Sequence, residues 1–148
     1  MNCPTKNAAN ILVVDDDLVN LQVVTGALAR AGFATVSANT GESAMDCLKE
    51  EQFDAVVTDV QMPHMSGIEL LQNISARFPQ LPVILMSAQI EEHVREAASI
   101  WGARALFEKP VNRADLIQTI RLHLQRPAGF DCEFASSGWS ATSDKIQP

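Results

Sequence analysis

Polar residues stand where apolar runs of the chain end, and they are the first candidates for chemistry. Asp15 and Asp16 follow the run ILVV, and Asp59 ends the run DAVVTD. Ser87 lies near the end of PVILMSA, and Lys109 follows RALFE. A carboxylate that leaves water is costly unless a cation or a hydrogen bond compensates its charge. The position of Asp59 therefore predicts a compensating partner elsewhere in the sequence.

Together these residue types suit phosphoryl transfer onto a carboxylate. Neighbouring acids repel one another and raise one another's pKa unless a cation enters. A hard divalent ion fits such a site, and Mg²⁺ usually binds through a few carboxylates while keeping water ligands. We predict that Asp59 is a nucleophile that forms an acyl phosphate. Mg²⁺ and Lys109 would neutralise charge on the transferring group, and Ser87 would donate a hydrogen bond to a phosphate oxygen.

Short apolar runs alternate with amphipathic stretches, and this pattern predicts the elements that position these residues. Buried-strand patterns cover 11–14, 34–38, 54–59, 82–88 and 104–108. Helical spacing covers 18–31, 42–51, 68–78, 90–101 and 117–124. Successive β-α units of this kind predict an α/β fold with a doubly wound, five-stranded parallel sheet. The expected topology is flavodoxin-like (β/α)5, with strand order 2-1-3-4-5.

The ends of the predicted strands bring the candidates together. In the order 2-1-3-4-5 the switch point lies between the first and third strands, and ligands bind there beyond the carboxyl ends. Adjacent strands lie about 5 Å apart, so Asp15, Asp16 and Asp59 are expected to share one pocket. Lys109 would start about 10 Å from Asp59, two strand spacings away, and its long side chain can cover much of that gap.

Two of the predicted helices carry further detail. Asp17 is predicted to cap the first helix at its N-terminus, and Gly32 is predicted to end it. The helix at 90–101 carries an apolar stripe at helical spacing. The members of this stripe are Ile90, Val94, Ala97, Ala98 and Trp101.

The composition bounds the class of protein. At 148 residues the chain most simply forms one domain with a sizeable core. A formal net charge of -7 argues against nonspecific nucleic-acid binding. The sequence contains no bilayer-spanning apolar run and no signal-peptide pattern, and its three cysteines lack disulfide or zinc-site spacing. These features predict a cytoplasmic protein with free thiols.

The alternation of strands and helices also sets the predicted domain boundaries. We expect an N-terminal extension at residues 1–9 and the domain itself at residues 10–126. Residues 127–148 are rich in Ser, Gly and Ala and show no clear period. They are predicted to be a tail or linker, mostly mobile.

Four segments carry a resemblance to a known family. ILVVDDD, VVTDVQMPHMSG, VILMSA and FEKP resemble the receiver domain of two-component response regulators, over about 10–125. The set is specific because four separate segments agree in content, order and spacing. The resemblance implies that Asp59 is the phosphoacceptor, Ser87 the switch hydroxyl and Lys109 the phosphate-contacting lysine.

The resemblance also implies a metal ion and a partner. Asp15 and Asp16 match the acid pair that holds Mg²⁺, with Asp59 and the backbone carbonyl of Gln61 completing the protein ligands. The phosphodonor would be a phosphohistidine on a sensor histidine kinase or a histidine phosphotransfer protein. In such domains the bond between Lys109 and the following proline is often cis. The domain would not be an enzyme, because it would catalyse only its own phosphorylation and dephosphorylation.

One position departs from the family pattern. Receivers commonly carry Tyr or Phe three residues before the lysine, and this chain has Leu106 there, followed by Phe107. Because side chains alternate along a strand, Phe107 is expected to face the opposite side of the sheet. The aromatic side chain that accompanies switching in the family is therefore absent from its usual position, although no pocket residue is missing.

Signalling in the family implies a population shift. The phosphoryl group adds roughly -1.5 to -2 charge and would draw Ser87 and the loop after it inward. The output surface would be the helix at 90–101, the strand at 104–108 and the helix at 117–124, including Val94, Trp101 and Arg104. It would signal to a partner protein or to a linked effector, and the sequence leaves this choice open.

Two other functions remain open at this point. Asp15-x-Asp17-x-Val19 looks like the first motif of haloacid-dehalogenase phosphatases, in which the first Asp is the nucleophile. Against it, the chain has no late acidic pair for Mg²⁺, and Asp59 would have no role. The second alternative is a receiver-shaped interaction module that is never phosphorylated, and Leu106 is the feature that favours it.

Overall fold

The structure is a computed structural model, and it describes residues 8–125. The predicted N-terminal extension at 1–9 lies almost wholly outside the described residues, and the predicted tail at 127–148 lies wholly outside them. Both therefore stay predictions. The described residues cover nearly all of the predicted domain at 10–126.

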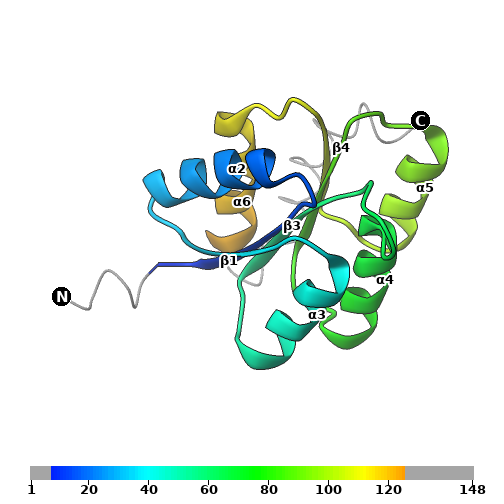
Figure 1. The fold of residues 1–148 in the computed structure, drawn as a ribbon, viewed down its shortest axis with the longest axis horizontal. Helices are drawn as coiled ribbons and strands as arrows, with labels where there is room; N and C mark the ends of the chain where they lie inside the picture. Colours follow the sequence, from blue (N-terminus) through cyan, green and yellow to red (C-terminus); the bar gives the residue numbers. More distant parts are fainter. Residues whose placement is uncertain (1–7, 126–148) are drawn as a thin grey trace.

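Within residues 8–125, strands and helices alternate as predicted (Figure 1). The strands are β1 (Asn10–Val14), β2 (Ala34–Ala38), β3 (Ala55–Asp59), β4 (Val83–Ser87) and β5 (Ala105–Glu108). The helices are α2 (Leu18–Arg30), α3 (Gly41–Glu50), α4 (Gly67–Arg77), α5 (Glu92–Ile100) and α6 (Arg113–Gln125). Every predicted element is present, and most of their ends lie close to the predicted ones.

The start of α6 is the largest boundary difference. The apolar spacing predicts a helix from 117, and the helix begins at Arg113. The side-chain oxygen of Asn112 accepts a hydrogen bond from the backbone N–H of Asp115 at 3.1 Å. This cap stabilises a polar first turn that an apolar pattern does not detect.

The sheet is parallel throughout, with strand order β2-β1-β3-β4-β5. This confirms the predicted order 2-1-3-4-5 and the doubly wound class. α2 and α6 cover one face of the sheet, and α3, α4 and α5 cover the other (Figure 1). With both faces covered, the inner strands read as continuous apolar runs, as parallel strands generally do.

Two apolar clusters fill the space between the sheet and its helices. The cluster under α2 and α6 includes Ile11, Val13, Leu28, Val57, Ile84 and Ile120. The cluster under α3, α4 and α5 includes Leu12, Val56, Leu70, Ile74, Leu85 and Leu106. Alternate residues of β1, β3, β4 and β5 enter opposite clusters, which fixes the side of the sheet on which each of their strand-end residues lies.

Both ends of α2 agree with the prediction. The side chain of Asp17 accepts hydrogen bonds from the backbone N–H groups of Val19 at 3.1 Å and Asn20 at 3.4 Å. Gly32 has a φ of 100°, in the region that favours glycine. The entry of α2 beside the strand end is therefore set by residues directly before its first turn.

Leu106 and Phe107 lie on opposite faces of the sheet, as alternation predicts. Leu106 is 2% exposed and packs in the cluster under α3, α4 and α5. Phe107 packs against the cluster under α2 and α6. The face that the family's aromatic residue would occupy thus carries a buried leucine.

Val94 and Trp101 were both expected on the output surface, and the assignment of Val94 needs correction. Val94 was expected on the output surface but is only 3% exposed, because it packs with Ala98 against the sheet. Trp101 belongs to the same apolar stripe in the sequence but is 40% exposed. It stands at the end of α5 as its C-cap residue, where the last turn has passed the edge of the core.

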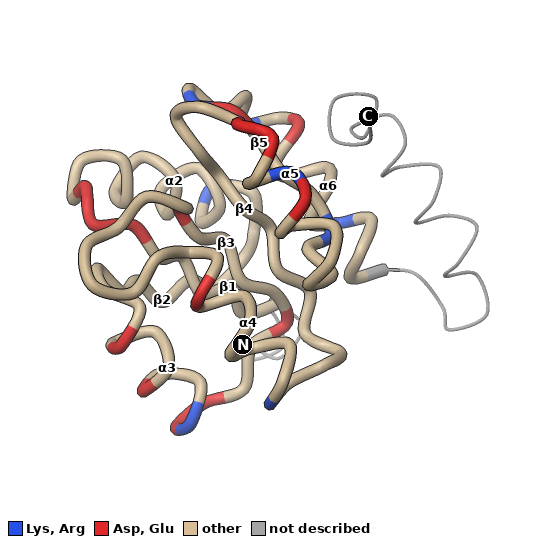
Figure 2. The backbone as a smooth tube through the Cα atoms, turned by 90° about the vertical axis from the view of Figure 1, so that its right-hand side faces the viewer, with Lys and Arg blue, Asp and Glu red and all other residues tan. Residues whose placement is uncertain are grey.

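The surface of the described residues is mixed in charge. Figure 2 shows their Lys and Arg residues scattered along the chain without a continuous basic stripe. No helix among residues 8–125 is both long and apolar enough to cross a membrane. The bond between Lys109 and Pro110 is cis, as the family resemblance implied.

Candidate functional site

The register of the central strands places Asp15 beside Asp59. Val14 of β1 pairs with Thr58 of β3, so the next residue on each strand lies at the same level. Both carboxylates are buried, with Asp15 at 0% and Asp59 at 4% exposure. The switch point of the sheet therefore holds two acids that water does not solvate.

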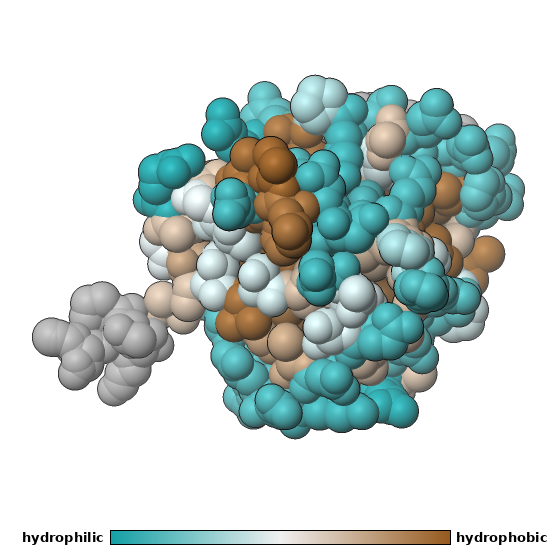
Figure 3. Space-filling model, in the orientation of Figure 1, coloured by the Kyte–Doolittle hydropathy of each residue, from teal (hydrophilic) through white to brown (hydrophobic). Residues whose placement is uncertain are grey.

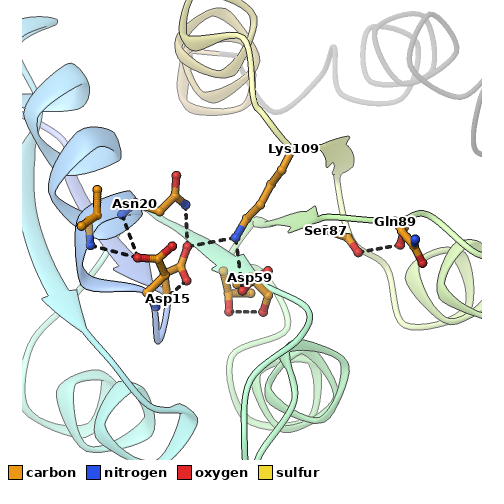
Figure 4. Close-up of polar contacts among 9 residues, drawn as sticks. Asp15, Asn20, Asp59, Ser87, Gln89 and Lys109 are labelled. Carbon is orange, nitrogen blue, oxygen red and sulfur yellow. Dashed lines mark hydrogen bonds and ion pairs between the residues drawn. The ribbon is translucent and has the colours of Figure 1, made fainter.

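Lys109 supplies the compensating charge that the buried acids require. Its Nζ lies 3.3 Å from Oδ2 of Asp15 and 3.3 Å from Oδ2 of Asp59 (Figure 4). One ammonium therefore bridges carboxylates from two different strands. Breaking a buried pair of this kind leaves an uncompensated charge, so the lysine is a structural as well as a chemical part of the site.

Asp15 is also held by the N-terminus of α2. Its Oδ1 accepts a hydrogen bond from the backbone N–H of Asp17 at 3.0 Å, and its Oδ2 accepts one from Nδ2 of Asn20 at 2.5 Å (Figure 4). Sequence reasoning did not identify Asn20. The available signal was its position in the first turn of a helix that begins directly after the acids.

The three acids fit a metal ion. One ligand oxygen each from Asp15, Asp16 and Asp59 lies within 4.8 Å of the others. Oxygens that share one Mg²⁺ at about 2.1 Å lie at most about 4.2 Å apart, so small side-chain rotations suffice. Oδ1 of Asp59 is buried without a hydrogen-bond partner, although buried carboxylate oxygens are normally paired. The donor set is oxygen only, which suits Mg²⁺ rather than a softer ion.

Ser87 occupies the expected strand end but faces away from the acids. It is fully buried, and its hydroxyl donates a hydrogen bond to the backbone carbonyl of Gln89 at 2.7 Å. In Figure 4 this hydroxyl points away from Lys109 and Asp59. The structure thus brings the acids and the lysine together and leaves Ser87 outside that contact.

Strand alternation explains this separation. Asp15, Asp59 and Lys109 each follow by two residues a strand position that packs toward α2 and α6. Ser87 follows Leu85, which packs toward α3, α4 and α5. Side chains two residues apart share a face of a strand, so the charged residues share one side and Ser87 starts from the other.

A close approach of the backbone positions the loop after β3. The backbone N–H of Gly67, the first residue of α4, donates to the carbonyl of Val60 at 2.8 Å. A Cβ at position 67 would collide with the backbone carbonyl of Asp59. Glycine is therefore required here, and α4 closes directly against the residue that carries the candidate nucleophile. Gln61 lies in this loop and is exposed, and the metal-ligand role of its carbonyl stays a prediction.

The environment shifts the pKa values of the central pair. Burial and the neighbouring charge of Asp15 raise the pKa of Asp59 to about 6, and Lys109 offsets only part of this rise. For Lys109, burial lowers the pKa, but the carboxylates of Asp59 and Asp15 outweigh it, and the pKa lies above its ordinary value. The lysine stays charged at neutral pH, and the acid is near the balance between its two forms in mildly acidic solution.

The raised pKa of Asp59 gives a pH dependence of stability without divalent ions. The folded state binds the proton more tightly than the unfolded state, so the free energy of unfolding should fall as pH rises from about 4 to about 6. A shift of about two units corresponds to about 3 kcal/mol at most. Urea unfolding in a chelator should show this loss in the wild type, relative to Asp59→Asn. Parallel pH profiles for the two proteins would contradict the assignment.

The sheet order and the contacts at the strand ends define a flavodoxin-like α/β domain with an acidic, lysine-bridged site at its switch point. The profile of the response regulator receiver domain matches residues 11–121. The sensory/regulatory protein RpfC of Xanthomonas campestris is 33% identical over 114 residues, which cover 74% of this chain and 16% of RpfC. The transcriptional regulatory protein ZraR of Escherichia coli is 33% identical over 129 residues, covering 87% of this chain and 29% of ZraR.

Solved structures agree with the family match. The BeF3-activated DrrB receiver domain is 30% identical with a TM-score of 0.74, and the match covers 80% of this chain and 99% of that domain. The chain belongs to the response regulator receiver domain family, whose members are signalling domains of two-component systems. It spans only 16% and 29% of the curated relatives RpfC and ZraR.

Proposed function

We propose that this chain is a phosphoacceptor in a two-component or phosphorelay system. Asp59 accepts a phosphoryl group, with Mg²⁺, from a phosphohistidine on a sensor histidine kinase or a histidine phosphotransfer protein. The observation that carries the proposal is the state of the Asp59 carboxylate. One oxygen is held by Lys109 at 3.3 Å, while the other is buried without a hydrogen-bond partner beside two further acids.

The proposed transfer has a simple balance. A carboxylate oxygen of Asp59 forms a bond to phosphorus as the bond from phosphorus to the donor nitrogen breaks. The electron pair of the broken bond stays on that nitrogen, and the imidazole leaves neutral when its other nitrogen carries a proton. Lys109 stabilises the negative charge on the phosphoryl oxygens.

The acidic cluster supplies the proposed metal ligands. Asp15, Asp16, Asp59 and the backbone carbonyl of Gln61 would hold Mg²⁺. When bound, the ion would neutralise charge on the phosphoryl oxygens. We further propose that the protein is not an enzyme toward other molecules and catalyses only its own phosphorylation and dephosphorylation. The cytoplasm is the proposed location.

Ser87 is the proposed switch. On phosphorylation its hydroxyl would donate a hydrogen bond to a phosphoryl oxygen in place of the carbonyl of Gln89. The loop before α5 would then move toward the acidic site. The surface of α5, β5 and α6 would then change and signal to a partner or a linked effector. Ile100 and Trp101, at 73% and 40% exposure, are the apolar residues that α5 offers there.

The exposed apolar start of α2 is the proposed docking surface for the phosphodonor. Leu18, Val19 and Val23 are 59%, 70% and 44% exposed, and brown side chains gather over this end of α2 in Figure 3. The first of them lies within three residues of the metal-binding acids. A partner that packs here would bring a phosphohistidine to the acidic site, because α2 begins directly after the loop that carries the acids.

Removing this apolar surface should slow transfer from a protein donor only. The double variant Leu18→Gln, Val19→Gln keeps the charge of the site unchanged. It is expected to reduce the transfer rate about tenfold from a histidine phosphotransfer domain that phosphorylates the wild type. Phosphorylation by acetyl phosphate should stay within twofold, and Ile100→Gln should affect neither reaction. Equal transfer by the double variant would remove this surface from the proposal.

The test of the proposed function is direct. The protein is incubated with acetyl phosphate, with and without Mg²⁺, and its intact mass is measured. One phosphoryl adduct that needs Mg²⁺ and resides on Asp59 supports the proposal. An adduct on Asp15 would support the phosphatase alternative, although both oxygens of Asp15 already accept hydrogen bonds. No adduct with any donor would support the unphosphorylated module.

A further inference from the structure

Asn20 reaches the acidic site from the first turn of α2. It is half-buried, and its Nδ2 donates a hydrogen bond to Oδ2 of Asp15 at 2.5 Å. The same oxygen lies 3.3 Å from Nζ of Lys109. Figure 4 shows the amide and the ammonium approaching this oxygen from different elements. Asp15 is therefore held by a neutral donor and a charged one at once.

The position of Asn20 in its helix accounts for this contact. It is the third helical residue after the N-cap Asp17, and a side chain there leans back toward the N-terminus. At this position a Glu or Gln commonly accepts a hydrogen bond from the backbone N–H of the N-cap residue. In α2 that N–H instead donates to Oδ1 of Asp15 at 3.0 Å. The side chain at position 20 is thus free to serve another partner.

α4 of the same molecule shows the usual arrangement. Its N-cap is Ser66, and Glu69 at the third helical position accepts a hydrogen bond from the backbone N–H of Ser66 at 3.1 Å. The side chain of Glu69 therefore completes a capping box and points at its own helix. Asn20 occupies the equivalent place in α2 but donates to an acid of the strand end. The amide of Asn20 therefore contacts a residue of the acidic site, whereas the carboxylate of Glu69 caps its own helix.

A neutral donor has a specific advantage beside a cation site. It stabilises the ionised carboxylate by a hydrogen bond and orients it. Unlike Lys109, it adds no positive charge that would repel a divalent ion. With Asp17 on one oxygen and Asn20 on the other, the carboxylate of Asp15 is fixed from the α2 side. Oδ2 also accepts a hydrogen bond from Lys109, so Oδ1, which accepts one hydrogen bond, keeps a lone-pair direction for another ligand.

We propose that Asn20 is a positioning residue that holds Asp15 in its metal-binding orientation and thereby sets the affinity of the site for Mg²⁺. The inference rests on the proposed function in one respect, namely that Asp15, Asp16 and Asp59 bind Mg²⁺. It does not require that phosphorylation occurs. The contribution of one hydrogen bond to a charged group corresponds to about a tenfold change in affinity.

The test compares Asn20→Ala and Asn20→Leu with the wild type. Ala and Leu both favour helix more than Asn does, so weakening of α2 is no explanation for an effect. Leu keeps the branched shape of the side chain but replaces the whole amide, and with it the donor, by two larger methyl groups. Gln22→Ala, on an exposed position of the same helix, is the matched control. Mg²⁺ affinity is measured by calorimetry on the unphosphorylated protein, with thermal unfolding in a chelator to verify the fold.

Both Asn20 variants should bind Mg²⁺ about three- to tenfold more weakly, and Gln22→Ala should bind it as the wild type does. With acetyl phosphate, the Mg²⁺ concentration for half-maximal rate should rise by the same factor, while the rate at saturating Mg²⁺ stays within twofold. Unchanged Mg²⁺ affinity in folded Asn20→Leu would overturn the inference. The inference would also be overturned if the phosphorylation rate at saturating Mg²⁺ fell while the Mg²⁺ concentration for half-maximal rate stayed unchanged. A wild type that binds Mg²⁺ but is never phosphorylated would overturn the proposed function, while the calorimetric comparison would still decide the role of Asn20.

Discussion

Asp59→Asn is expected to abolish the phosphoryl adduct that acetyl phosphate and Mg²⁺ form on the wild type. The substitution keeps the shape of the side chain but replaces the nucleophilic carboxylate by an amide, which cannot form an acyl phosphate. Intact mass measured over time checks this result. The loss should be complete, because no other acid in the site combines burial, contact with Lys109 and an unpaired oxygen.

Two controls test whether the adduct is lost because Asp59→Asn unfolds or because any acid of the domain has been removed. Asp59→Asn removes a buried carboxylate that burial and Asp15 destabilise, so its thermal stability at neutral pH should equal or exceed that of the wild type. Asp46→Asn changes an exposed acid of α3 and should be phosphorylated normally. An adduct that persists in Asp59→Asn and disappears in Asp15→Asn would transfer the nucleophile to Asp15.

Lys109→Met is expected to slow phosphorylation about 100-fold or more while leaving Mg²⁺ affinity intact or higher. The substitution removes the ammonium that lies 3.3 Å from both Asp15 and Asp59. Loss of one electrostatic donor that stabilises charge in a transition state commonly costs about 100- to 1,000-fold in rate. The acids lose a competing cation at the same time, so a divalent ion should bind at least as tightly.

Two measurements check the Lys109 prediction. The rate is measured with acetyl phosphate at saturating Mg²⁺, and Mg²⁺ affinity is measured by calorimetry without a phosphodonor. Lys109→Arg keeps the charge, but a planar guanidinium cannot place one nitrogen between both carboxylates. The phosphorylation rate of Lys109→Arg should therefore lie between those of the wild type and Lys109→Met. A Lys109→Met protein that reacts at the wild-type rate would leave the lysine a purely structural role.

Asn20 and Lys109 give opposite expectations although they contact the same oxygen of Asp15. Removing the neutral donor should weaken Mg²⁺ binding, and removing the charged donor should not. The contrast follows from Coulomb repulsion, which acts between the ammonium and a divalent ion but not between an amide and that ion. Measuring the Asn20 and Lys109 variants together therefore tests whether Mg²⁺ affinity depends on the positive charge of Lys109 or on the orientation of Asp15.

The sequence was sufficient for the fold and for most of the site because both follow from local periodicity. Alternating apolar and amphipathic runs predict parallel strands, and the carboxyl ends of parallel strands share one edge of the sheet. This rule alone brings Asp15, Asp16, Asp59 and Lys109 to one region. Asp17 and Gly32 were predictable for the same reason, since helix ends depend on residues next to them.

The contacts made by individual side chains were decided by the tertiary structure. The amide of Asn20 turns to Asp15 because the backbone N–H of Asp17 is already satisfied there. The hydroxyl of Ser87 turns to the carbonyl of Gln89, two residues further along the chain. Neither direction is encoded in apolar spacing, because a rotamer depends on which donors and acceptors surrounding elements present.

The same distinction explains the error at Val94. Val94 and Trp101 occupy one apolar stripe in the sequence, yet the first is buried in the core and the second is 40% exposed. A helical period determines which residues share a face, but the extent of the sheet beneath that face determines where burial ends. The sequence by itself thus determined the order of elements and the residues at their ends. Only tertiary packing decided which of those residues face the core, the solvent or the acidic site.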